Sequence, residues 1–142
     1  AAHCPNITEL TINNCNGRPS TLILAAFTKM LASCADLCRL DMQSCMFVTD
    51  DYLVAIASQA KHITSLCLTE CSVSDAGLAH VAKHCTELKD ISCSTGEGHL
   101  VTEKCKLLFR IEVTVELDNT DARNAYIATN AAGGGGDFLG FF

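Results

Sequence analysis

Cysteine is the residue type through which this chain could most readily do chemistry, since ten cysteines occur in 142 residues. Thiolates act as nucleophiles and as zinc ligands. The spacing of Cys34 with Cys38, and of Cys67 with Cys71, loosely matches that of paired metal ligands. In each pair, however, the predicted strand directs one side chain to the core and leaves the other on or near the solvent side. The thiols diverge, and the pairs predict no metal site.

Other catalytic patterns are equally weak. There is no glycine-rich loop between a strand and a helix followed by Lys and Ser or Thr, and no serine in a plausible nucleophile elbow. Gly133 to Gly136 is a linker rather than a phosphate cradle. We therefore expect neither enzymatic activity nor a metal or cofactor. The five histidines fall at predicted helix ends or turns without zinc-site spacing to paired cysteines: His3, His62, His80, His84 and His99.

The cysteines belong to a repeated frame. Cys34 is followed by apolar residues three, six and eight positions later and by Cys45 after eleven, and residues 40–43 alternate as in a half-buried strand. The frame starts again at positions 4, 60 and 85 and, more weakly, at 105. Inward thiols predict reduced, structural cysteines and a reducing compartment rather than a disulfide scaffold. The inward cysteines are Cys4, Cys15, Cys34, Cys45, Cys71, Cys85, Cys93 and Cys105.

The frame resembles the cysteine-containing leucine-rich repeat found in F-box/leucine-rich-repeat proteins. The resemblance is carried by residues 3–15 (HCPNITELTINNC) and 71–82 (CSVSDAGLAHVA), and it extends from residue 3 to about residue 129. It implies an α/β leucine-rich-repeat solenoid, with a curved parallel sheet on the concave side and helices on the convex side. It also implies substrate recognition for an SCF-type, cullin-based ubiquitin ligase. The sequence shows no F-box, so this chain alone would lack the adaptor-binding part.

The predicted organisation is a repeat domain of about five units over residues 1–129, followed by a glycine-rich hinge and apolar tail over residues 130–142. The tail could cap the last repeat, fold back over the concave face, dock into a partner or fray. Residues 1–3 look like the end of a helix from a preceding repeat, so we expect a fragment or an end covered by another subunit. Helices are expected from Ser20 or Thr21 to about Ser33, from Thr49 or Asp50, from Ser74, and from Thr120 or Asp121 to Thr129, with a single turn within 96–104 and a strand over 109–116.

Function in such a fold would lie on the outward strand positions, five, seven and nine residues after each frame start. Fourteen of these fifteen residues are polar, and their mixed charges predict a protein-binding surface read by hydrogen bonds and ion pairs. A merely solvated sheet face is the alternative. Cys67 is the exception. It is either a reactive thiol or an ordinary small residue that the position tolerates. The fifteen are Glu9, Thr11, Asn13, Arg39, Asp41, Gln43, Ser65, Cys67, Thr69, Asp90, Ser92, Ser94, Arg110, Glu112 and Thr114.

Charge and hydropathy narrow the choice of partner. A net charge of −6 and a pI near 5.2 disfavour nucleic acid, which needs clustered Lys and Arg. No apolar run approaches the roughly 20 residues that span a bilayer. We expect a protein partner within a larger complex in the cytoplasm, the cilium or the nucleus. The alternative function is a structural subunit of a large assembly, such as a ciliary axonemal or mitochondrial complex.

Overall fold

Strands and helices alternate along the chain, whose computed structural model describes residues 6–95, 100–109 and 112–117. The five strands form one parallel sheet in the order β1-β2-β3-β4-β5, so neighbours in sequence are neighbours in space. The elements are β1 (Glu9–Thr11), α1 (Thr21–Ser33), β2 (Arg39–Asp41), α2 (Asp50–Gln59), β3 (Ser65–Leu68), α3 (Asp75–His84), β4 (Asp90–Thr95), the 3₁₀ helix η1 (Glu103–Leu107) and β5 (Glu112–Leu117).

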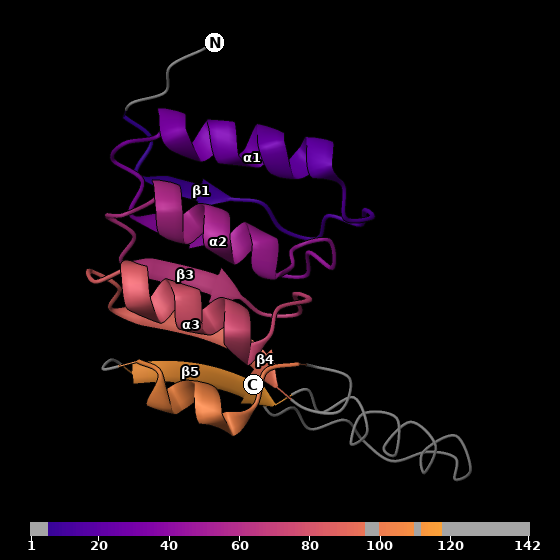
Figure 1. Ribbon diagram of the computed structural model, residues 1–142, viewed down its shortest axis with the longest axis vertical. Coiled ribbons are helices and arrows are strands. Elements are labelled where there is room, and N and C mark those ends of the chain that lie inside the picture. The colour runs from indigo at the N-terminus through magenta and orange to yellow at the C-terminus, as the bar shows by residue number, and fades with distance from the viewer. Residues whose placement is uncertain (1–5, 96–99, 110–111, 118–142) are drawn as a thin grey trace, which may run out of the picture.

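The helices form one layer and the strands a second, with α1, α2 and α3 stacked side by side (Figure 1). Parallel neighbours require a crossover between them, and crossovers of one hand place every helix on the same face. This confirms the predicted α/β class and the parallel sheet with helices on one side. Three predicted helix starts are also confirmed, because Ser20, Thr49 and Ser74 are the N-cap residues of α1, α2 and α3.

The core lies between these two layers. Leu40, Leu66 and Ile91 occupy equivalent positions on neighbouring strands and are each at most 1% exposed. On β1 the equivalent Leu10 is only partly buried, because β1 is the edge strand of the sheet. Tyr52 fills the space under α1, with its ring centroid 5.1 Å from that of Phe27.

Cysteine thiols connect successive strands. The Sγ of Cys45 donates to the carbonyl of Ile12 (2.9 Å), and the Sγ of Cys71 donates to the carbonyl of Met42 (3.0 Å). Both thiols occupy the last position of the frame, and each reaches back to the preceding strand. The repeated frame predicted only small buried hydrophobes at these positions, whereas both thiols also satisfy buried carbonyl groups. None of the nine described cysteines forms a disulfide, and Cys4 lies outside the described residues.

In the first three units, the residue before the frame-ending cysteine (Cys15, Cys45 or Cys71) has left-handed backbone geometry. The φ angles are 56° at Asn14, 58° at Ser44 and 56° at Glu70. Such values are uncommon outside glycine, and they turn the chain sharply at the end of each strand. The turn directs the thiol that follows toward the neighbouring unit.

Carboxylates connect successive helices in a similar way. Asp50 begins α2 and accepts hydrogen bonds from the backbone N–H (2.8 Å) and hydroxyl (2.6 Å) of Ser74, the N-cap of α3. Asp75 does the same for Thr102, the N-cap of η1, at 2.9 and 2.6 Å. The sequence predicted these acids only as favourable charges at helix N-termini. They also hold the start of the next helix in place.

The fifth unit differs from its predicted register. The frame placed Arg110 beside Asp90, whereas β5 begins at Glu112 and Asp90 pairs with Glu112. The strand is displaced by two residues because η1, with Cys105 buried on it, occupies Glu103–Leu107. The single helical turn expected within 96–104 therefore lies later than predicted. The helix expected over 120–129 and the tail over 130–142 lie outside the described residues.

The thiol contacts should contribute measurably to stability. We expect Cys71→Ala to lower the free energy of unfolding by about 1 kcal/mol more than Cys85→Ala, because only Cys71 donates a hydrogen bond to a buried carbonyl. Both side chains are buried (4% and 3% exposed), so their transfer and cavity costs should match. Urea unfolding under reducing conditions measures the difference. Equal losses for the two variants would show that the thiol contributes only its volume.

Gly77 provides the second test, because a Cβ there would lie 2.7 Å from the Asp50 Cγ and 2.9 Å from the Leu53 Cδ1. Helix propensity alone predicts that Gly77→Ala stabilises α3 by about 1 kcal/mol. We expect destabilisation instead, by about 1–3 kcal/mol, as for other overpacked sites. In an Asp50→Ala background the same substitution should cost clearly less. Additive effects of the two substitutions on urea unfolding would refute the proposed contact.

Candidate protein-binding face of the sheet

The face of the sheet opposite the helices carries the candidate site. Side chains alternate along a strand, so residues between the core positions point away from the helices. We call the solvent-accessible set of these residues the polar sheet face. Its described members are Glu9, Thr11, Asn13, Arg39, Asp41, Gln43, Ser65, Cys67, Asp90 and Ser92.

These side chains lie in rows across the strands, which are about 4.8 Å apart in a sheet. The first row follows the pairing of Glu9 with Arg39, of Arg39 with Ser65 and of Ser65 with Asp90. Glu9, Arg39 and Asp90 are exposed, and none of them forms an ion pair with another described residue. Their charges are therefore available to a partner.

Two residues of the third row, Thr69 and Ser94, do not belong to this surface. Thr69 and Ser94 were predicted to face solvent, but each is only 5% exposed, so that prediction is wrong. The hydroxyl of Ser94 accepts a hydrogen bond from the Glu70 backbone N–H (2.8 Å). The side chain of Asn13 likewise accepts from the Gln43 N–H (3.0 Å). These polar side chains thus accept hydrogen bonds from the backbone of a neighbouring unit, at or beside its left-handed residue.

The register of the last strand differs from the predicted one. Arg110 lies outside the described residues, so its predicted place on the surface stays a prediction. The register of β5 places Glu112 beside Asp90 and Thr114 beside Ser92. An acidic residue thus occupies the row position where the sequence predicted an arginine.

Cys67 lies in the second row, half-buried, with its Sγ 3.6 Å from the Thr69 hydroxyl. The register pairs it with Asp41 on one side and Ser92 on the other, whereas Arg39 pairs with Ser65. Activation of a thiol requires a nearby cation, and no cationic side chain pairs with Cys67 in the described sheet. This geometry does not favour the reactive-thiol alternative.

The buried thiols are poor nucleophiles. Burial raises the pKa of Cys71 and Cys93 to about 12 and that of Cys85 to about 11, compared with an ordinary value of 9.0. The thiol, not the thiolate, is then the stable form at neutral pH, and a thiol is what donates a hydrogen bond. Within the described ranges, no three His, Cys, Asp or Glu side chains converge as a metal site.

Comparison with known proteins supports the fold. No family model matches this chain. The solved structure of Leiomodin-1 Actin-Binding Site 2 (ABS2) is similar, with a TM-score of 0.60 over 89% of this chain and 80% of that chain. The two sequences are 17% identical, so the likeness concerns the fold alone. In the part of the chain that the structure describes, no helix has the length and apolarity to cross a membrane.

The raised pKa values predict that the free energy of unfolding falls at alkaline pH. In the unfolded chain Cys71, Cys85 and Cys93 should titrate near 9.0, but in the folded chain they titrate near 11 or 12. Their contribution is therefore complete below about pH 9 and is lost as the pH rises toward the folded values. Over that window each thiol lowers the free energy of unfolding by at most about 1.4 kcal/mol per pH unit.

Urea unfolding under reducing conditions at a series of pH values measures this dependence. We expect the unfolding free energy to fall above about pH 9, and a Cys85→Ala variant to fall less steeply. An unfolding free energy that stays constant across this range would contradict the burial of these thiols.

Proposed function

We propose that this chain is a leucine-rich-repeat-like protein-recognition module that binds a protein partner on its polar sheet face. The observation that carries the proposal is a row of exposed charges across β1, β2 and β4, namely Glu9, Arg39 and Asp90, with no ion pair to another described residue. A sheet held by parallel pairing presents such side chains at fixed spacing. A partner therefore need not order the surface that it binds.

The solenoid architecture is part of this proposal. It is supported by the sequential order of the strands, by thiol contacts repeated from unit to unit, and by carboxylate contacts between successive helices. The similarity in fold to Leiomodin-1 Actin-Binding Site 2 agrees with it. In a solenoid each unit contacts only its neighbours, so the sheet forms one extended surface.

The partner should be basic where it contacts the sheet. The described face carries three acidic residues, Glu9, Asp41 and Asp90, and one basic residue, Arg39. The register of β5 pairs a further acidic residue, Glu112, with Asp90. Complementary charges favour a segment with Lys or Arg side chains and one acidic group opposite Arg39. Recognition of substrates for an SCF-type ubiquitin ligase is a narrower form of this proposal and rests on the sequence resemblance alone.

A structural subunit of a larger assembly is the second candidate, favoured by apolar surface at the β1 edge. Leu22 is 80% exposed, Ile23 is 46% exposed and Leu10 is only partly buried. A neighbouring subunit over this edge would remove that surface from water. Stable co-purification with a fixed set of proteins would favour the assembly, whereas exchange among several partners would favour a recognition module.

The test is a charge exchange on the sheet face. The double variant Arg39→Glu/Asp90→Lys preserves the net charge while reversing the sign of two charges in the row. We expect a loss of about tenfold or more in partner binding, because like charges placed opposite one another cost several kcal/mol. Quantitative affinity capture from cell extract measures this loss. Purified actin is a defined additional ligand to test, given the description of the similar structure.

The control is Lys29→Glu/Asp36→Lys, which makes the same exchange at two exposed positions off the sheet face, one on α1 and one in the turn before β2. It should retain binding, and circular dichroism should show both variants folded. If the sheet variant captures the same proteins in the same amounts as the control, the polar sheet face is not the binding surface.

A further inference from the structure

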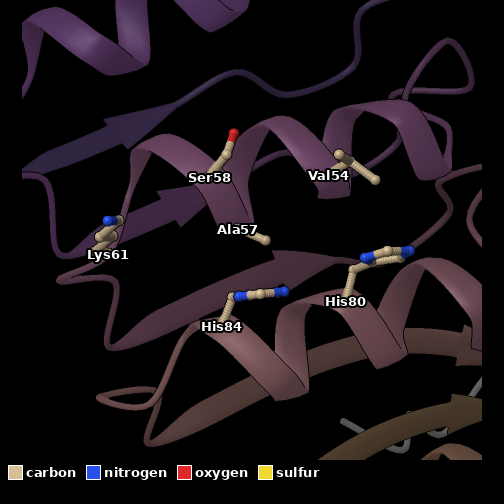
Figure 2. Close-up of a pocket in the computed structure, with 6 residues that line it drawn as sticks. All are labelled: Val54, Ala57, Ser58, Lys61, His80 and His84. Atoms are coloured by element: carbon tan, nitrogen blue, oxygen red, sulfur yellow. The ribbon is translucent and has the colours of Figure 1, made fainter.

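A hollow of about 320 Å³ lies in the helix layer, on the opposite side of the molecule from the polar sheet face. It lies between residues of α2 and α3. Figure 2 shows the imidazole rings of His80 and His84 projecting from α3 toward the space beside Ala57 and Val54 of α2. The lining residues are Val54, Ala57, Ser58, Lys61, His80 and His84.

The helix places the two imidazoles together. Residues four apart on an α-helix lie on one face, with about 5–6 Å between their Cβ atoms. The neighbouring face of α3 is fixed in the core by Leu78 and Val81, both fully buried, so α3 cannot rotate the histidines away from the hollow. The pair is a consequence of how α3 packs.

Neither imidazole is engaged in the described part of the protein. His80 and His84 are exposed, and no other described side chain forms a hydrogen bond or ion pair with them. His62 differs, because its Nδ1 lies 3.1 Å from the Glu87 carboxylate. Both nitrogens of each ring in the pair are therefore open to a ligand.

We propose that His80 and His84 form a two-imidazole site for a borderline divalent transition-metal ion such as Ni²⁺, Cu²⁺ or Zn²⁺. Imidazole nitrogen is the protein ligand that these ions favour, and histidines one helical turn apart can bind the same ion. The remaining coordination positions are open to water or to side chains from a partner. The site does not depend on the function proposed for the sheet face.

An anion is the other ligand that this hollow could take, since Lys61 also lines it. The polar groups do not converge for that purpose. The Ser58 hydroxyl donates to the Ala55 carbonyl at 2.9 Å and points away from α3, and Lys61 follows the end of α2 (Figure 2). A net charge of −6 on the chain also favours a cation over an anion.

Calorimetric titration of the intact chain with Ni²⁺ in a non-coordinating buffer tests the site. His80→Gln and His84→Gln should each lower the affinity by about tenfold or more, since even loss of an outer-shell partner costs a metal site ten- to a hundredfold. His62→Gln is the matched control, with one exposed histidine removed elsewhere, and should bind as the wild type does. The thiols are the same in all variants, so binding by cysteine cannot produce the difference.

The proposal is overturned if the double variant His80→Gln/His84→Gln binds Ni²⁺ as tightly as the wild type. It is also overturned if the chain binds inorganic phosphate, loses that binding on Lys61→Gln, and shows no Ni²⁺ binding. Glutamine is compatible with an exposed helix, and circular dichroism should confirm that each variant is folded. A rise in melting temperature on adding Ni²⁺ to the wild type, absent in the double variant, would support the site independently.

Discussion

The structure depends on hydrogen bonds that each unit makes to the unit before it. The carbonyl of Thr8 accepts from the N–H groups of Cys38 and Arg39, and that of Thr64 accepts from Lys89 and Asp90. Beyond the strands, the thiol of Cys71 adds a side-chain hydrogen bond to the Met42 carbonyl. A side chain at that position must be small, apolar enough to be buried and able to donate a hydrogen bond. Cysteine satisfies all three conditions, which gives Cys45 and Cys71 a structural role without redox or metal chemistry.

The carboxylate contacts set the spacing of the helix layer in the same way. Asp50 holds both the backbone and the hydroxyl of Ser74, and Gly77 leaves room for its carboxylate. Strand ends and helix starts are thus fixed by different side chains acting between the same pairs of units. The polar sheet face and the hollow beside His80 are both defined by this spacing, one on each side of the molecule.

Much of the fold could be predicted because it is local in sequence. Periodic apolar residues located α1, α2 and α3, and the alternation at residues 40–43 gave the correct inward face. The carboxylate contacts join residues 24 and 27 apart, so one frame read alone cannot reveal them. The register of β5 was missed because η1 uses residues that the frame assigned to the approach of the strand.

The candidate site was predictable only in part, for a related reason. Alternation correctly placed Glu9, Arg39 and Asp90 on the exposed face. It failed for Thr69, which lies just beyond β3, because alternation describes a strand and its rule ends where the strand does. It also failed for Ser94, which lies within β4 but is buried and accepts a hydrogen bond from the Glu70 N–H. The spacing of four between His80 and His84 was visible in the sequence. Whether both rings are accessible to a ligand depends on which face of α3 is buried.

The buried thiols have one further consequence. Cys45, Cys71, Cys93 and Cys105 lie in successive units and are shielded from solvent in the native state. A reagent that modifies thiols can reach each of them only when its own part of the stack opens. The chain therefore carries native reporters, distributed along its length, from which the order of fraying could be read without any added label.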